Sequence, residues 1–377
     1  MKRVPITIAA LLFLGVALAG HPANATQFQR VTTDSTRESD PAPSPDGKWL
    51  AYSSDKGRST QIWVMPIGGG HARQLTSEPD SVRIPDPEHQ DSLRTTVVRA
   101  STPTWAPDSK SVLFISTRTG RFDIYSIPLA GGKPRRLSNA PGNHRFAVYS
   151  PDGKEIAFFS NRLQPDALFG FNIFVMDSGG ETPDHLARQL TNSNGSPGHP
   201  TWSPDGAWIA YVSKEFDPKK KIDVGKGMQM AQNALTATYK PYKIPAQGGR
   251  GTRLGEERVN GKDYEDTWPT WDPAEARWLA VARTIDGKRD VWILDTTTGR
   301  GFPLTNTGNA SKPTWTHDGK AIYFTTLEGR NEDVWIATDL TLRSPAPSTQ
   351  SHPAPAKRAA RPVKKTTSGA TTGKTAK

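Results

Sequence analysis

The side chains best suited to chemistry in this chain stand directly before six related segments, of which the fourth reads Pro-Thr-Trp-Ser-Pro-Asp-Gly. These preceding positions are mostly charged or imidazole side chains: Asp40, Thr102, the pair His144 and Arg145, His199, the pair Glu265 and Asp266, and Lys312. Imidazole nitrogens suit transition metals, and carboxylate oxygens suit calcium. If the fold gathers these positions around one opening, they could bind a ligand or hold a divalent cation.

We expect the binding residues to be His144, Arg145, His199, Glu265, Asp266 and Lys312. His144, His199 and Asp266 are the candidate metal ligands, and a divalent metal such as calcium is the only cofactor considered. We assign no catalytic residue. No local motif such as His-Glu-x-x-His fixes the geometry of this set, so each histidine could instead simply end a loop. The elements that carry these residues therefore decide between the two interpretations.

The six segments are internal repeats, and they begin at Pro41, Pro103, Ala147, Pro200, Pro269 and Pro313. Repeats of about this length are typical of stacked or radial arrays. In the third unit, residues 147–149, 155–159, 172–176 and 188–191 are predicted strands, and Ser150-Pro151-Asp152-Gly153 is a tight turn. Six such four-stranded antiparallel sheets, arranged radially, make a six-bladed β-propeller. We interpret the repeated tryptophans as packing between blades and the repeated aspartates as turn residues.

The last repeat lacks a fourth strand, since the chain turns polar after Asp339. Gln29-Arg30-Val31-Thr32 resembles the fourth-strand segment Arg188-Gln189-Leu190-Thr191. We therefore expect residues 28–33 to supply the outer strand of the sixth blade and to close the ring. Closure removes an open sheet edge that could aggregate.

Both ends of the chain differ from the repeats, so we divide it into residues 1–25, 26–341 and 342–377. Lys2 and Arg3 precede an apolar run, and Ala23-Asn24-Ala25 follows, which predicts a cleaved signal peptide over residues 1–25. The apolar run is too short to span a membrane. There is no cysteine, hence no disulfide framework. We expect a monomer that is periplasmic or secreted and is not membrane-spanning.

The net charge of +11 arises mainly from the ends of the chain. Residues 342–377 carry eight Lys and Arg and no acid, and the signal carries two more, so the net charge of residues 26–341 is +1. The Pro, Ala, Thr and Lys content of residues 342–377 predicts a disordered basic tail. Such a tail could hold an anionic cell-wall polymer, or it could be merely solvated. We expect no nucleic-acid partner, because export separates the protein from nucleic acid.

Two insertions interrupt the repeats, from Glu78 to Ala100 and from Lys214 to about Thr238. Loops of this length in a compact domain are usually functional or disordered. Residues Met228–Leu235 favour a short helix, which could cap one face of the ring. A variable loop with no ligand is an equally good interpretation.

The repeat, with its Asp-Ile-Tyr-like third strand and Leu-Thr ending, resembles the propeller repeats of TolB-like proteins over about residues 28–340. The resemblance implies a periplasmic propeller that docks a peptidoglycan-associated lipoprotein within an envelope assembly. These proteins carry an α/β domain before the propeller, whereas here the repeats follow the signal directly. The prolyl oligopeptidase family also uses such propellers, but no Gly-x-Ser-x-Gly occurs here, which argues against a serine peptidase.

We therefore predict an exported protein-binding propeller with an envelope protein as its partner. The alternative is a metal-dependent lyase or hydrolase that acts on a poly- or oligosaccharide at the channel mouth. A third interpretation is a structural protein tethered to the cell wall by its tail. No motif demands catalysis, which favours binding, and the two histidines sustain the enzyme alternative.

Overall fold

The computed structural model describes residues 26–85, 92–165, 170–179, 184–192, 196–215, 238–329, 331–340 and 342. The predicted signal peptide, the tail beyond Leu342 and the expected helix Met228–Leu235 lie outside the described residues. All described strands belong to one compact unit that ends at Thr341. No described helix is long and apolar enough to cross a membrane.

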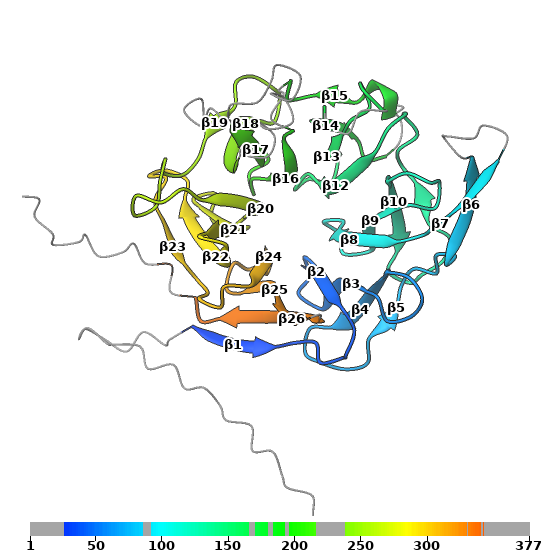
Figure 1. Ribbon diagram of the computed structural model, residues 1–377, viewed down its shortest axis with the longest axis horizontal. Helices are drawn as coiled ribbons and strands as arrows, with labels where there is room; N and C mark the ends of the chain where they lie inside the picture. Colours follow the sequence, from blue (N-terminus) through cyan, green and yellow to red (C-terminus); the bar gives the residue numbers. More distant parts are fainter. Residues whose placement is uncertain are drawn as a thin grey trace, which may run out of the picture. The chain divides into compact units, whose positions relative to one another are not determined.

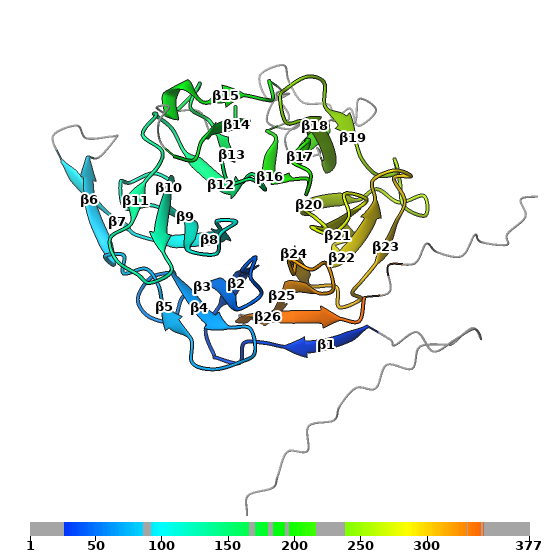
Figure 2. The same ribbon diagram turned by 180° about the vertical axis from the view of Figure 1, so that it is seen from behind.

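Six four-stranded antiparallel sheets stand around a central channel, as the repeats predicted (Figures 1 and 2). The first three blades consist of β2 (Glu38–Pro43), β3 (Trp49–Ser54), β4 (Gln61–Pro66) and β5 (Arg73–Gln74); β8 (Ala100–Trp105), β9 (Ser111–Ser116), β10 (Asp123–Pro128) and β11 (Arg135–Arg136); and β12 (His144–Tyr149), β13 (Glu155–Ser160), β14 (Asn172–Asp177) and β15 (Arg188–Gln189). A short 3₁₀ turn, η1 (Asp184–Leu186), precedes β15.

The remaining blades follow the same order. They consist of β16 (Gly198–Trp202), β17 (Trp208–Glu215), β18 (Thr238–Pro245) and β19 (Thr252–Arg253); β20 (Glu265–Trp271), β21 (Trp278–Ile285), β22 (Lys288–Asp295) and β23 (Gly301–Pro303); and β24 (Ala310–Trp315), β25 (Ile322–Glu328), β26 (Asn331–Thr338) and β1 (Gln27–Arg30). The first strand of each blade is the innermost one (Figure 1).

The N-terminal strand closes the ring, as predicted from its likeness to the fourth strands. β1 pairs antiparallel with β26, with Gln27 opposite Thr338 and Arg30 opposite Trp335. The hydroxyl of Thr32 accepts a hydrogen bond from the backbone N–H of Val334 (2.9 Å). Thr76 and Thr191 accept the same bond from Ile62 and Ile173 in their own blades. The Leu-Thr ending therefore attaches a fourth strand to its third strand, and Val31-Thr32 does so across the closure.

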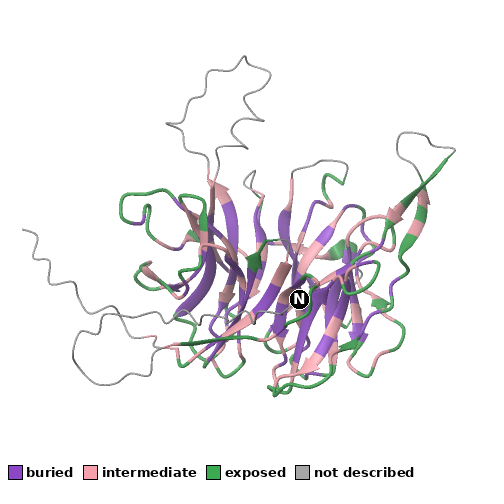
Figure 3. Cartoon of the chain, turned by 60° about the horizontal axis from the view of Figure 1, so that its bottom comes forward, coloured by how far each residue is buried: buried purple, intermediate pink, exposed green. Residues whose placement is uncertain are grey.

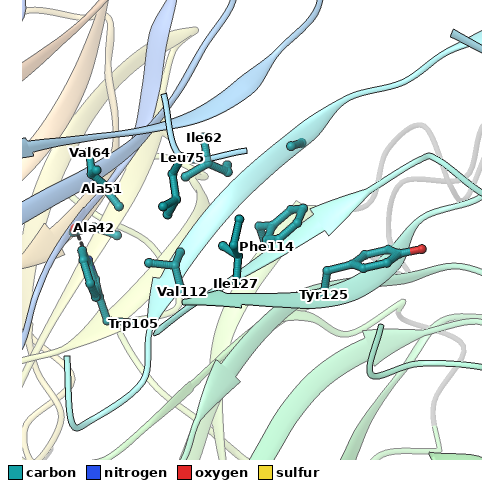
Figure 4. Packing of buried hydrophobic residues seen from close by; sticks show 11 residues of the cluster. Ala42, Ala51, Ile62, Val64, Leu75, Trp105, Val112, Phe114, Tyr125 and Ile127 are labelled. Carbon is teal, nitrogen blue, oxygen red and sulfur yellow. Dashed lines mark hydrogen bonds between the residues drawn. The ribbon is translucent and has the colours of Figure 1, made fainter. Parts of the chain in front are cut away.

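The hydrophobic core lies between neighbouring blades. One cluster joins blades 1 and 2 through side chains that include Ile62, Val64, Val112 and Phe114 (Figure 4). Trp105 contributes to it and donates a hydrogen bond from Nε1 to the carbonyl of Ala42 in the preceding blade (2.8 Å). Seen from the side, most buried residues lie on the strands of the ring, whereas many of the exposed ones lie in the loops (Figure 3). The repeated tryptophans thus pack between blades, as the sequence indicated.

The Pro-Asp-Gly segments form the turns between first and second strands. In blade 3 the carboxylate of Asp152 accepts hydrogen bonds from the hydroxyl of Ser150 (2.6 Å) and the N–H of Lys154 (3.1 Å). The Ser150 bond, followed by the Lys154 bond, lowers the pKa of Asp152. These aspartates are turn residues, which confirms their interpretation from the repeat.

The first insertion forms a β-hairpin, which the sequence did not reveal. β6 (Ser81–Pro85) pairs with β7 (Leu93–Val97) as a separate two-stranded sheet at the rim of blade 2 (Figures 1 and 3). Its strands are short and mostly polar, so their alternation was weak. Of the second insertion, from Lys214 to about Thr238, residues 216–237 lie outside the described residues.

Candidate functional site at the channel mouth

Every first strand carries a β-bulge at the same register. The bulge is a break in pairing with the second strand, for example between Ser39 and Ala42 in blade 1 and between Thr267 and Thr270 in blade 5. One residue in each bulge adopts a left-handed backbone with φ between 48° and 54°. We call these the ring residues: Asp40, Thr102, Phe146, His199, Trp268 and Lys312. A bulge re-aims a side chain, and all six residues line the central cavity.

The cavity that they surround has a volume of about 190 Å³. Two positions further along the first strands, Thr104, Thr201, Thr270 and Thr314 also line it. The channel is therefore faced by charged and aromatic side chains and Thr102 at the bulges, and by further threonine hydroxyl groups beyond them. This volume lies below the range of about 300 to 1,000 Å³ that is typical of sites for whole small-molecule ligands.

An ion-pair network forms the part of the ring contributed by blades 6 and 1. The ammonium of Lys312 lies 3.0 Å from Asp40 and 3.5 Å from Glu332. Arg37 pairs with the same Glu332 (3.0 Å), and Ser53 donates a hydrogen bond to Asp40 (2.9 Å). Burial disfavours both charges, but their attraction outweighs it, so the pKa of Lys312 is raised and that of Asp40 is lowered. These four charged groups sum to zero.

Aromatic rings form the part contributed by blades 3 to 5. The ring of His199 lies 4.0 Å from that of Phe146 and 5.3 Å from that of Trp268, measured between centroids. Lys312 lies 6.0 Å from the Trp268 centroid and so joins the two parts. Neither nitrogen of His199 has a hydrogen-bond partner among the described residues. Burial lowers the pKa of His199 to about 4, and the imidazole is neutral at pH 7.

His144 does not line the channel, contrary to the prediction. Its ring is fully buried between hydrogen-bond partners: Nε2 lies 2.9 Å from the carbonyl of Ala140, and Nδ1 lies 2.9 Å from the hydroxyl of Ser160. Since a carbonyl only accepts, the proton is on Nε2, and Ser160 donates to Nδ1. Both nitrogens are therefore engaged in holding the blade together.

Asp266 and Glu265 also lie outside the cavity lining. Asp266 is fully buried and forms a two-bonded ion pair with Arg283, with both N–O distances at 2.7 Å. The guanidinium of Arg283 in turn lies over the ring of Tyr264 (4.1 Å). Glu265 lies at the start of β20, three residues before the ring residue Trp268.

The structure thus corrects the predicted metal set. His144, His199 and Asp266 are not brought together, because His144 and Asp266 are held by Ser160 and Arg283. Among the described residues, no group of three or more His, Asp or Glu side chains is placed to hold a metal ion. Of the six predicted binding residues, His199 and Lys312 line the channel. Arg145 is not part of the lining, and its guanidinium stacks on Phe122 (3.5 Å).

The missed ring residues are Phe146 and Trp268. A signal for Trp268 was present, because five of the six ring residues directly precede the proline of the repeat. Counting back from Pro269 leads to Trp268 rather than to the acidic pair. Blade 3 has Ala147 in place of that proline, and only alignment of its repeat with the others identifies Phe146.

No family model matches the chain. Among curated relatives, the uncharacterised peptidase YuxL of Bacillus subtilis is 29% identical over 192 residues, which cover 50% of this chain and 24% of the relative. The TolB homolog of Protochlamydia amoebophila is 24% identical over 252 residues, or 66% of this chain and 45% of the relative. A Tol-Pal system protein TolB of Francisella tularensis is 33% identical over 85 residues, which cover 22% of this chain and 19% of the relative. The alignments thus span less than half the length of these three relatives.

Solved structures share the fold at low sequence identity. A putative TolB from Agrobacterium tumefaciens superposes with a TM-score of 0.56 at 18% identity, covering 83% of this chain and 97% of that one. TolB from Acinetobacter baumannii superposes with a TM-score of 0.53 at 18% identity, covering 81% of this chain and 64% of that one. An oligogalacturonate lyase from Vibrio parahaemolyticus superposes with a TM-score of 0.50 at 11% identity, covering 83% of this chain and 97% of that one. The chain is thus a six-bladed β-propeller that is similar in sequence and in fold to TolB proteins.

Proposed function

We propose that this chain is an exported binding module that recognises a protein of the cell envelope at the channel mouth. The ring of six bulge residues carries this proposal, because it places aromatic and charged side chains around one opening. The small volume supports a partner that inserts a side chain or a short loop over a ligand that enters whole. Similarity to TolB proteins supports an envelope partner. The signal-like residues 1–25 support export.

The neutral ion-pair network and the neutral His199 shape the expected recognition. A partner gains contact area on Phe146 and Trp268, since aromatic side chains dominate the energetics of interface cores. It does not have to separate Lys312 from Asp40, which would leave a buried charge unpaired. The polysaccharide-cleaving alternative would need a metal set that the described residues do not assemble.

Capture from crosslinked cell envelopes tests the proposal. The full chain is compared with a His199→Ala/Trp268→Ala variant, and with a control that replaces Trp49, a partly buried core residue of blade 1, by phenylalanine. We expect one dominant protein to be captured by the full chain and by the control, and to be lost with the ring variant. Capture that persists with the ring variant, or that depends only on residues 342–377, would contradict a binding site at the mouth.

A further inference from the structure

His199 leaves hydrogen-bonding capacity unused at the channel mouth. Both of its ring nitrogens are buried, and neither has a hydrogen-bond partner among the described residues. His144, the other histidine of the predicted site, has a partner on each nitrogen. Buried polar groups in folded proteins are nearly always hydrogen-bonded, and an unsatisfied one disfavours the state that contains it. A ligand group that bonds the imidazole of His199 therefore breaks no existing bond of the protein.

His199 can present a nitrogen to the cavity while its neighbours keep their places. The residue is half-buried and lines the cavity, so its exposed part consists of atoms other than the two nitrogens. A half-turn of the imidazole about its Cβ–Cγ bond exchanges each nitrogen with a ring carbon and keeps the outline of the ring. The packing against Phe146 and Trp268, at 4.0 Å and 5.3 Å between ring centroids, is therefore retained.

The charges around the mouth favour an uncharged group beside His199. Burial lowers the pKa of His199 to about 4, so its imidazole is neutral at pH 7. The two charged ring residues, Asp40 and Lys312, neutralise each other at 3.0 Å. A charged side chain inserted beside His199 would lose its hydration without gaining an unpaired opposite charge. A purely apolar side chain would leave both imidazole nitrogens unsatisfied.

The neighbours of the imidazole favour an aromatic ring on the inserted group. Phe146 and Trp268 contact His199 from blades 3 and 5, and both are half-buried and line the cavity. An incoming aromatic ring gains stacked or edge-to-face contact with such rings. Tyrosine and tryptophan combine an aromatic ring with a neutral hydrogen-bonding group. The indole N–H only donates, whereas a phenol hydroxyl can bond either nitrogen of a neutral imidazole.

We infer that the channel mouth takes a tyrosine side chain of the partner, with its ring against Phe146 and Trp268 and its hydroxyl on a nitrogen of His199. The inference rests on the binding function proposed above. The cavity of about 190 Å³ is consistent with one inserted side chain. The hydroxyl donates to the unprotonated nitrogen of the imidazole or accepts from its N–H, so the neutral mouth stays neutral.

Ligand-observed NMR with small probes tests the inference on the full chain. The probes are the N-acetyl amides of tyrosine, phenylalanine, tryptophan and glutamine, which differ only in their side chains. Saturation-transfer titrations give their dissociation constants for the wild type, for His199→Phe and for His71→Gln, a matched control at an exposed histidine. We expect the tyrosine probe to bind the wild type and the control about ten-fold or more tighter than the phenylalanine probe.

His199→Phe keeps an aromatic ring in place and removes both nitrogens, so the tyrosine and phenylalanine probes should bind this variant equally. A measurement on the wild type guards against a folding defect in the variant. With ¹⁵N-labelled histidine, the tyrosine probe should move the ring-nitrogen resonances of one histidine further than the phenylalanine probe does at equal occupancy.

Three results would overturn the inference. They are equal binding of the phenylalanine and tyrosine probes to the wild type, a preference for tyrosine that persists in His199→Phe, or competition by the tryptophan probe, the glutamine probe or galacturonate as strong as by the tyrosine probe. The last result would assign the mouth to a different side chain or to a sugar.

Envelope capture separates this inference from the proposed function. A partner that is lost with the His199→Ala/Trp268→Ala variant, while the wild type shows no preference for the tyrosine probe, sustains the proposed function and refutes the tyrosine. A clear preference for the tyrosine probe, together with capture that persists in that variant, refutes the proposed function and leaves a phenol-binding mouth.

Discussion

At the scale of single residues, the two histidines of the predicted site have different surroundings but the same neutral protonation state. His144 is enclosed by Ser160 and Ala140, whereas His199 lies among the rings of Phe146 and Trp268. Burial is the largest cause of the lowered pKa in both, and each pKa lies at about 4. Both imidazoles are therefore neutral in the folded protein and acquire a proton readily only when it unfolds.

The difference between the histidine pKa values of the folded and the unfolded state makes the stability of the protein depend on pH. An unfolded histidine titrates near 6.5, so between about pH 6.5 and 4 the unfolded state binds more protons than the folded state. The free energy of unfolding should therefore be fully maintained above about pH 6.5 and fall as the pH drops toward 4. The loss is at most about 3 kcal/mol for each histidine.

Urea unfolding at several pH values measures this effect. His199→Phe should reduce the fall in stability between neutral and acidic pH, while replacement of the exposed His71 by glutamine should leave it unchanged. If His199→Phe shows the same pH dependence as the wild type, the assignment of a neutral imidazole to the half-buried His199 is wrong.

At the scale of elements, the hairpin β6–β7 depends on blade 2 for its order. An isolated two-stranded hairpin is at best marginally stable in water. Here Ile84 contacts the loop 117–122, and the backbone at Arg99 is bonded to Thr117. Gly120 allows the close approach of Ile84 and has a φ of +86°, which other residues adopt at a cost.

Replacing Gly120 by alanine should release the hairpin without unfolding the ring. The added Cβ would lie 2.7 Å from Ile84, so the hairpin has to move away. Gly57, in the corresponding loop of blade 1, is the matched control: its φ is +142°, and no atom lies within 4 Å of an added Cβ. Both variants should lose about 1 kcal/mol from backbone strain.

Amide hydrogen exchange distinguishes the two variants. Faster exchange of the amides of β6 and β7 is expected only in Gly120→Ala, with unchanged protection in β9. Equal exchange in both variants would show that the contact of Ile84 does not order the hairpin.

At the scale of the whole molecule, the two ends of the folded region meet in one sheet. β1 covers the edge of β26, and Arg30 forms an ion pair with Asp333 across the closure (2.7 Å). Phe28 lies edge-on to Phe324 at 6.2 Å between ring centroids. Without β1, the last blade would present an open edge with unpaired backbone groups.

Removal of residues 26–32 should therefore destabilise the entire ring. Loss of the β1 hydrogen bonds and the Thr32 bond costs roughly 3 to 6 kcal/mol, and the exposed edge should cause aggregation that rises with concentration. Thermal melts and size-exclusion chromatography measure both effects. A synthetic peptide of residues 26–32 should partly restore stability, and a scrambled one should not.

Removal of residues 343–377 is the control, and we expect it to leave the melting temperature unchanged. If the chain without residues 26–32 melts like the wild type, ring closure by β1 is not a source of stability.

The sequence by itself determined the architecture of the ring. Each repeat carries its own turn and its own inter-blade tryptophan or equivalent. Four of the six also carry a fourth strand followed by a threonine or serine whose hydroxyl accepts a hydrogen bond from the third strand, and these features act locally. Even the closure was predictable, because Val31-Thr32 has the same chemistry as Leu190-Thr191. Local rules repeated six times leave few alternative folds.

Only the tertiary structure decided which side chains enter the channel. The bulge in each first strand shifts the pairing by a residue, and a one-residue shift moves a side chain to the other face of a strand. This shift placed Phe146 and Trp268 in the channel and His144 and Asp266 in the protein interior. The partners of those two residues, Ser160 and Arg283, lie on neighbouring strands and are not marked by any spacing along the chain. Side-chain direction thus depends on pairing between strands, which a repeat in one chain specifies only indirectly.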